Sequence, residues 1–118
     1  MSNSWHDIIR EDELSEGEIH ATIKNGWHIF LINLDGEIRV WNDRCPHAAS
    51  HLSTGRIRRG AVMCPLHGAR FELKSGRCIG GTYSDLITFE HRNQDGMISV
   101  LLPDRSPTMA ELPISPPG

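Results

Sequence analysis

The stretches Cys45-Pro46-His47 and Cys64-Pro65-Leu66-His67 decide how this chain is interpreted. Each stretch supplies one thiolate and one imidazole, and sixteen residues separate the two. Thiolates and imidazoles are the side chains that bind iron, zinc and copper in proteins. The sequence therefore predicts one metal site built from Cys45, His47, Cys64 and His67.

The order of the four ligands separates two kinds of metal site. Two thiolates and two imidazoles can hold one zinc ion tetrahedrally, but zinc fingers usually pair Cys with Cys and His with His. Here each stretch contributes one ligand of each type. That crossed arrangement suits a Rieske [2Fe–2S] cluster, in which both thiolates bind one iron and both imidazoles bind the other. We therefore expect one Rieske cluster at these four residues, with zinc as the alternative.

The rest of the chain predicts an all-β domain, an antiparallel sandwich or barrel. Short alternating or β-branched segments are separated by turn signals such as Asn25-Gly26 and Asp35-Gly36, which favour tight hairpins. The segments expected as strands are residues 5–9, 18–24, 27–34, 37–42, 61–63, 71–73, 86–91 and 97–102. In the fourth of these, alternation places Ile38 and Val40 on one face and Trp41 on the other.

Length and composition limit the classes of protein. A chain of 118 residues suits one domain, here residues 1–102 with a cluster-binding subdomain at about 43–82. The five prolines from Pro103 onward predict an extended tail over residues 103–118 without catalytic content. No apolar run is long enough to span a membrane, and residues 1–7 lack the features of a secretory signal. We therefore expect a cytoplasmic protein.

The charges are unevenly distributed along the chain. Residues 1–43 contain nine acidic and three basic side chains, whereas residues 44–77 contain seven basic side chains and only Glu72 as an acid. Such a cluster is either solvated surface charge or a field that attracts a protein partner to the metal end. Nucleic acid is not expected as a partner, because the pI is near 6.1 and no basic–aromatic ladder is present.

The remaining cysteine and histidines are expected to be structural. Three cysteines make a poor disulfide framework, and Cys78 is expected to be a small half-buried residue near a turn. His51 lies near the first stretch, but the four ligands already complete the set.

No catalytic triad or phosphate-binding loop accompanies the motif. We therefore expect an electron carrier and not an enzyme.

The segment from Arg44 to Phe71 resembles the cluster-binding region of the Rieske family. The domain from Trp5 to Leu102 resembles the small Rieske-type ferredoxins of bacterial aromatic-ring-hydroxylating dioxygenase systems. The resemblance implies that Cys45 and Cys64 bind an inner iron and that His47 and His67 bind an outer iron near the surface. It also implies stacked antiparallel sheets with a small cluster subdomain inserted between strands.

The chain departs from the respiratory branch of that family at four positions. Ser50 and Leu66 occupy the places of two additional cysteines that form a disulfide there, so this bridge is absent. Ala69 and Phe71 occupy the places of a serine and a tyrosine whose hydroxyl groups donate hydrogen bonds to cluster sulfur. Because fewer donors stabilise the reduced state less, we expect a reduction potential at the low end of the Rieske range.

The resemblance further implies the partners. A flavin-dependent, NAD(P)H-oxidising reductase would supply single electrons, and a terminal oxygenase would receive them; the carrier itself is expected to be a monomer. Three alternatives remain open. They are the small Rieske subunit of an assimilatory nitrite reductase, a detached Rieske domain of an oxygenase, and a zinc-stabilised binding module without a redox role.

Overall fold

The computed structural model describes residues 2–46, 49–65, 69–80 and 83–113. Within this part of the chain there is no α-helix; the ordered elements are strands and two short 3-10 helices. The elements are β1 (Asn3–Arg10), η1 (Glu11–Glu13), β2 (Ile19–Lys24), β3 (Trp27–Leu34), β4 (Glu37–Asn42), η2 (Leu52–Thr54), β5 (Arg56–Arg58), β6 (Ala61–Met63), β7 (Arg70–Glu72), β8 (Cys78–Ile79), β9 (His91–Gln94) and β10 (Met97–Pro103).

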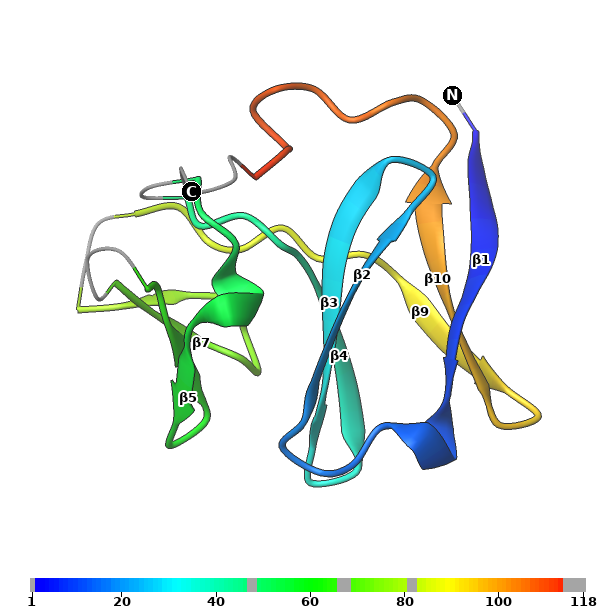
Figure 1. The fold of residues 1–118 in the computed structure, drawn as a ribbon, viewed down its shortest axis with the longest axis horizontal. Helices are drawn as coiled ribbons and strands as arrows, with labels where there is room; N and C mark the ends of the chain where they lie inside the picture. Colours follow the sequence, from blue (N-terminus) through cyan, green and yellow to red (C-terminus); the bar gives the residue numbers. More distant parts are fainter. Residues whose placement is uncertain (1, 47–48, 66–68, 81–82, 114–118) are drawn as a thin grey trace.

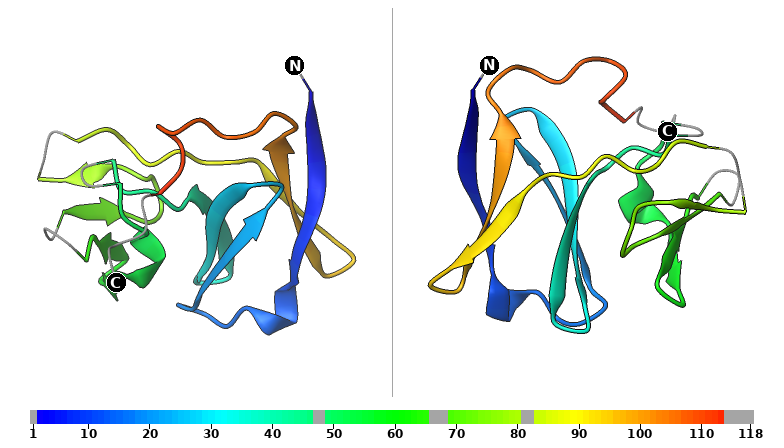
Figure 2. Two further views of the ribbon diagram at one scale, coloured as in Figure 1. Left: turned by 45° about the horizontal axis from the view of Figure 1, so that its top comes forward. Right: turned by 180° about the vertical axis from the view of Figure 1, so that it is seen from behind.

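The strands form three antiparallel sheets. Their strand orders are β1-β10-β9, β2-β3-β4 and β5-β6-β7-β8, and we name them sheets A, B and C. Figures 1 and 2 show sheet A at one end of the molecule, sheet B in the middle and sheet C at the other end. The prediction of stacked antiparallel sheets is therefore confirmed.

Tight turns set the register of the hairpins. Asn25-Gly26 and Asp35-Gly36, predicted from the sequence, have positive φ at both residues, and so do Arg59-Gly60 and Asp95-Gly96. Two consecutive positive φ angles are the signature of a type I′ turn, whose twist matches that of the flanking strands. The turn at Arg59-Gly60 was not predicted, because arginine rarely adopts this conformation.

Strand β3 lies between two hydrophobic cores. Ile29 and Leu31 pack into the core between sheets A and B, and Phe30 and Ile32 pack into the core between sheets B and C; all four are completely buried. Alternating side chains of one strand thus serve both cores. Each such side chain contributes about 1.5–3 kcal/mol through burial, so β3 fixes the cluster-binding half of the molecule to the other half.

Strand β4 leads from sheet B into the metal end. The predicted alternation is confirmed, because Val40 packs into the core with sheet A and Trp41 packs into the core with sheet C. The indole N–H of Trp41 donates to the carbonyl oxygen of Leu73 at 3.1 Å. This contact connects the last residues before the first ligand stretch to the turn that follows β7.

The prediction of a strand over residues 86–91 is wrong. The paired strand begins at His91, and within residues 86–90 only Thr88 forms an isolated bridge, opposite Trp41. Leu86 packs into the core beside sheet C, whereas Phe89 packs against the core beside sheet A. The segment crosses from one core to the other. Its strand-like sequence therefore reflects apolar residues that serve two cores and not membership of a sheet.

The C-terminal segment is also packed against the molecule. After β10, residues 104–113 run back across the top of sheet B toward the cluster-binding half, as Figure 1 shows. We call this segment the C-terminal strap.

Within the described residues, no helix is long and apolar enough to cross a membrane.

Candidate metal centre

The two predicted ligand stretches begin in the same way. The N–H of Cys45 donates to the carbonyl oxygen of Ser50 at 2.9 Å, and the N–H of Cys64 donates to the carbonyl oxygen of Ala69 at 2.7 Å. Each bond therefore joins a cysteine to the residue five positions later. The chain forms two loops of equal length, each starting at a cysteine and each containing one of the predicted histidines.

Both cysteines face one hydrophobic core. Cys45 and Cys64 are 0% and 1% exposed and belong to the core cluster between sheets B and C. Cys78, half-buried as predicted, packs against the same cluster. No disulfide joins these three cysteines. The two predicted thiolate ligands are thus shielded from water, as the inner iron of a cluster requires.

The two predicted imidazole ligands, His47 and His67, lie outside the described residues. Leu66, the second position of the disulfide in the respiratory branch, lies outside them as well. Among the residues that are described, no group of three or more His, Cys, Asp or Glu side chains forms a metal site. The role of the histidines therefore remains a prediction.

Ser50 connects the two loops. Its carbonyl oxygen closes the first loop at Cys45, and its hydroxyl group lies 3.2 Å from the sulfur of Cys64 in the second loop. The side chain is buried, with 3% of its surface exposed. A thiolate has no proton, so when Cys64 binds metal the Ser50 hydroxyl must be the donor. From the sequence, Ser50 was interpreted only as the residue at the position of a disulfide cysteine in the respiratory branch. Its contact with Cys64 was not predicted.

A buried carboxylate stabilises the segment between the loops. Asp43 is 2% exposed, and it accepts hydrogen bonds from the N–H and the hydroxyl group of Ser53 at 2.9 and 2.5 Å. Because buried carboxylates need such donors, this pair fixes the chain on both sides of the first loop. Asp43 was not predicted as a functional residue, since an acid next to a turn carries no distinctive signal.

His51, which is predicted to be a loop residue and not a ligand, immediately precedes η2. Its ring makes an edge-on contact with the ring of His28, with the ring centroids 5.5 Å apart. Burial lowers the pKa of His28 from its ordinary value of 6.5, the neighbouring His51 lowers it further, and the carboxylate of Asp43 opposes both effects. Burial and the neighbouring His51 ring thus favour the neutral form of His28 beside the first loop.

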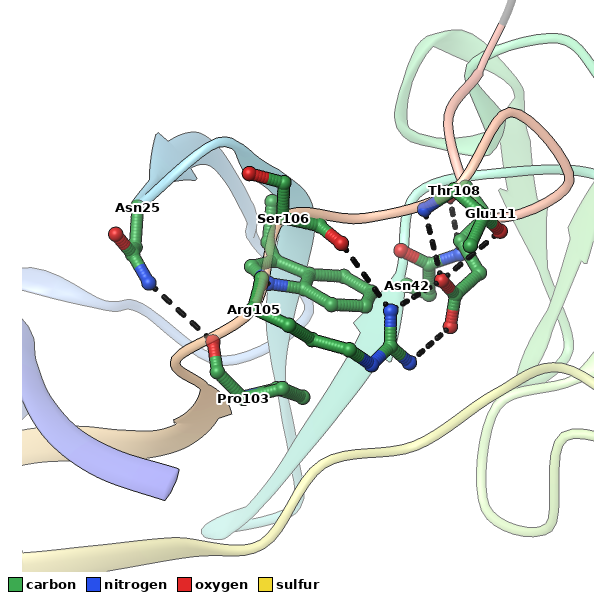
Figure 3. A network of polar contacts seen from close by, with 8 residues as sticks. Asn25, Asn42, Pro103, Arg105, Ser106, Thr108 and Glu111 are labelled. Atoms are coloured by element: carbon green, nitrogen blue, oxygen red, sulfur yellow. Dashed lines mark hydrogen bonds and ion pairs between the residues drawn. The ribbon is translucent and has the colours of Figure 1, made fainter. Parts of the chain in front are cut away.

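The C-terminal strap is bonded to the residues that precede Cys45. The side-chain amide of Asn42 donates to the carbonyl oxygen of Glu111 at 2.9 Å, and Nε of Arg44 donates to the carbonyl oxygen of Leu112 at 3.2 Å. Figure 3 shows Asn42 next to Glu111 at the turn of the strap. The predicted Pro-rich tail thus supports the first loop, although it supplies no predicted ligand.

An ion pair fixes the strap in this position. The guanidinium of Arg105 makes two hydrogen bonds with the carboxylate of Glu111, at 2.8 and 2.9 Å (Figure 3). Arg105 also lies over the ring of Trp27, 5.1 Å from its centroid, and the Trp27 indole donates to the carbonyl oxygen of Arg105. The arginine bond, more than any other contact, lowers the pKa of Glu111 from 4.5 to about 2.

Sequence comparison identifies the fold and the cofactor. The model of the Rieske [2Fe–2S] domain matches residues 4–90, which include both ligand stretches. The chain belongs to the Rieske [2Fe–2S] family. It therefore carries a Rieske-type [2Fe–2S] cluster.

Two similar proteins indicate the branch of the family. The chain is 32% identical over 79 residues to the ferredoxin component of the naphthalene 1,2-dioxygenase/salicylate 5-hydroxylase systems of Ralstonia sp., covering 67% of this chain and 76% of that protein. It is 39% identical over 82 residues to the 3-phenylpropionate/cinnamic acid dioxygenase ferredoxin subunit of Escherichia coli K12, with the same coverage. The protein is accordingly a Rieske-type ferredoxin, an electron carrier and not a catalytic component.

Solved structures confirm the fold. A chain in a complex of reduced oxygenase and oxidized ferredoxin of carbazole 1,9a-dioxygenase has a TM-score of 0.75 at 21% identity, covering 81% of this chain and 91% of that chain. A putative NADH-dependent nitrite reductase small subunit from Mycobacterium tuberculosis has a TM-score of 0.70 at 22% identity, with 84% and 95% coverage. The fold is common to both kinds of protein and does not separate them.

The described residues fit a Rieske cluster. Two thiols in one buried core, each at the start of a loop that contains a histidine, match a cluster whose two irons have different ligands. The Ser50 hydroxyl lies 3.2 Å from the sulfur of Cys64 and would donate to it when this sulfur is a thiolate ligand. The donor set is therefore chemically suited to the cofactor that the family carries.

Proposed function

We propose that Cys45 and Cys64 bind the inner iron and that His47 and His67 bind the outer iron. The burial of both sulfurs in the core between sheets B and C supports the first half of this assignment. The positions of His47 and His67 inside the two loops support the second half. When bound, the cluster supplies a one-electron redox couple.

We further propose the route of the electron. The protein carries single electrons from a flavin-dependent, NAD(P)H-oxidising reductase to the terminal oxygenase of an aromatic-ring dioxygenase system. The names of the relatives that are 32% and 39% identical support the oxygenase as acceptor. The reductase, a cytoplasmic location and a monomeric carrier rest on the family resemblance.

The chain's own residues perform three tasks in this role. The core between sheets B and C keeps water from the sulfurs of Cys45 and Cys64. Ser50 bonds to both loops and would donate to the sulfur of Cys64 when Cys64 binds the metal. The C-terminal strap fixes Asn42 and Arg44, the residues on which the first loop is mounted. A rigid site reduces the rearrangement that accompanies a change of charge, which favours rapid electron transfer.

Reconstitution tests the proposed function. The purified protein is combined with NADH, a ferredoxin reductase and the terminal oxygenase of a ring-hydroxylating system, and oxidation of NADH and hydroxylation of an aromatic substrate are followed. We expect substrate turnover only when all three proteins are present. Turnover of nitrite by a nitrite reductase large subunit, without turnover by any ring-hydroxylating oxygenase, would favour the nitrite reductase alternative.

A further inference from the structure

One face of sheet C presents a regular row of arginine and apolar side chains. The register pairs Arg56 with Met63, Met63 with Arg70, and Arg70 with Ile79, so these four residues form one row across β5, β6, β7 and β8. The row therefore alternates between a cation and an apolar side chain. We call these four residues the outer row.

The outer row faces away from the protein core. Val62 and Phe71 stand in the adjacent row of the same sheet and are completely buried in the core with sheet B. Because successive side chains of a strand point to opposite faces, the outer row lies on the other face. Met63 and Ile79 are 37% and 40% exposed, and both arginines are exposed.

The surface around the outer row is hollowed. A concavity of about 610 Å³ is lined by all four residues of the row together with Arg58 and Arg59. The ion pairs within the described residues are Arg10–Asp12, Arg39–Glu37 and Arg105–Glu111. The four arginines that line the concavity therefore form no ion pair among the described residues. Glu72, the one acid among residues 44–77, accepts a hydrogen bond from the Ser75 hydroxyl group. Four arginines thus share one concave surface with the apolar residues Ile57, Ala61, Met63 and Ile79.

The outer row adjoins the second ligand loop. Met63 immediately precedes Cys64, Arg70 immediately follows Ala69, and the two residues face each other across β6 and β7. A molecule that covers the row is therefore held beside the loop that contains His67. That placement suits a partner that exchanges an electron with the metal centre.

We propose that the outer row is a docking surface for an acidic segment of an electron-transfer partner, one that also inserts a large apolar side chain between the arginines. This inference rests on the proposed function and specifies the partner's surface. Carboxylates on the partner pair with the guanidinium groups, which bind carboxylates in a bidentate manner. An apolar side chain of the partner covers Met63 and Ile79, and the remaining charges attract the partner over a distance.

The test uses a fluorescently labelled peptide, Asp-Asp-Leu-Asp-Asp-Leu-Asp-Asp, as the probe for the cluster-loaded protein. Binding is measured by fluorescence anisotropy with the wild type, with R56E/R70E, and with K74E/R77E. The second double variant is the matched control, because it reverses two exposed charges of the same subdomain outside the hollow. A peptide with serine in place of leucine measures the apolar contribution.

We expect R56E/R70E to weaken binding about tenfold or more, which corresponds to about 1.4 kcal/mol, and K74E/R77E to leave it unchanged. The serine peptide should bind less tightly than the leucine peptide. Equal weakening by both double variants would overturn the proposal, because a diffuse field would then explain binding. A single-stranded oligonucleotide of equal charge that binds as tightly as the peptide would also overturn it.

Iron and acid-labile sulfide are assayed in the same samples. If the protein contains a complete cluster but R56E/R70E binds the peptide as tightly as the wild type does, the docking surface is contradicted and the proposed function remains intact. Specific peptide binding by a protein that lacks iron contradicts the proposed function and leaves the surface intact. The two proposals can therefore fail separately.

Discussion

The hydroxyl group of Ser50 lies 3.2 Å from the sulfur of Cys64, and the carbonyl oxygen of Ser50 accepts the N–H of Cys45. One residue thus joins both cysteine loops. A hydrogen bond to a ligand sulfur stabilises the more negative, reduced state of an iron–sulfur centre. When Cys64 binds iron, the Ser50 hydroxyl would donate to its sulfur and hold the reduction potential above that of the same site without this hydroxyl, although Ala69 and Phe71 supply no further hydroxyl donors.

The variant S50A tests this contribution. We expect its equilibrium constant for reduction to fall about tenfold, or about 59 mV for a one-electron couple, because the sulfur loses a donor. The measurement is a potentiometric titration, with S75A as a control whose hydroxyl group contacts Glu72. An S50A midpoint equal to that of the wild type would show that the hydroxyl does not affect the metal centre.

The absolute potential is a second prediction. The wild type is expected near the low end of the Rieske range, roughly −150 mV, because Phe71 is completely buried without a hydroxyl group and Ala69 has none. The variant A69S adds a hydroxyl at the residue that closes the second loop and is expected to raise the midpoint. A wild-type midpoint well above zero would contradict the sequence argument.

The contact between Gly76 and Trp41 gives a prediction about stability. Gly76 has a φ of +77°, and a Cβ added there would lie 2.7 and 2.8 Å from two atoms of the Trp41 ring. The variant G76A should therefore lose about 1–2 kcal/mol through backbone strain and about 1–3 kcal/mol more through overpacking. The measurement is the free energy of unfolding in urea.

Gly36 provides the matched control for that experiment. Its φ is +87°, but no atom lies within 4 Å of an added Cβ. The variant G36A should lose only the strain contribution of about 1–2 kcal/mol. If G36A and G76A are destabilised equally, the ring of Trp41 does not restrict Gly76, and the close packing of β4 against sheet C is not a source of stability.

The C-terminal strap should loosen in acid. The carboxyl of Glu111 has a pKa of about 2 in the folded strap, below its ordinary value of 4.5. A depressed pKa stabilises the folded strap above the ordinary value, and that stabilisation is lost as the pH falls toward 2. The Trp27 indole resonance, whose N–H donates to Arg105, should therefore shift between pH 4.5 and 2.

The variant E111Q is the test of that assignment. It cannot form the ion pair with Arg105, so its indole resonance should already be shifted at neutral pH and should not change between pH 4.5 and 2. The variant E90Q removes an exposed carboxyl group elsewhere and should behave like the wild type. If the indole resonance of the wild type and of E111Q depends on pH in the same way, a group other than Glu111 causes the acid transition.

Much of the fold could be predicted from local signals. The hairpins at Asn25-Gly26 and Asp35-Gly36 follow from residues that tolerate positive φ. Strand β5 was not predicted, because Arg56, Ile57 and Arg58 form a three-residue segment with a single apolar residue and all three are exposed. Its place in sheet C depends on pairing with β6, which is a relationship between strands and not a property of the segment.

The candidate site was also predicted in part from the sequence. The sequence predicted that Cys45 and Cys64 lie together, and the structure places both in one core, whereas the ligation by Cys45, His47, Cys64 and His67 stays a prediction. The contributions of Ser50, of Asp43 and of the strap could not be predicted, because each depends on contacts between segments that the fold brings together. Serine, aspartate and proline are also common in loops, so their types alone do not indicate a site.

Pulsed EPR of the reduced protein, with and without isotopically labelled histidine, tests the ligand assignment most directly. The assignment predicts two imidazole nitrogens bound to the reduced iron, both altered by the label, and the loss of one of them in H47C and in H67C. A reduced protein without a bound imidazole nitrogen would contradict it, as would a colourless protein that holds zinc.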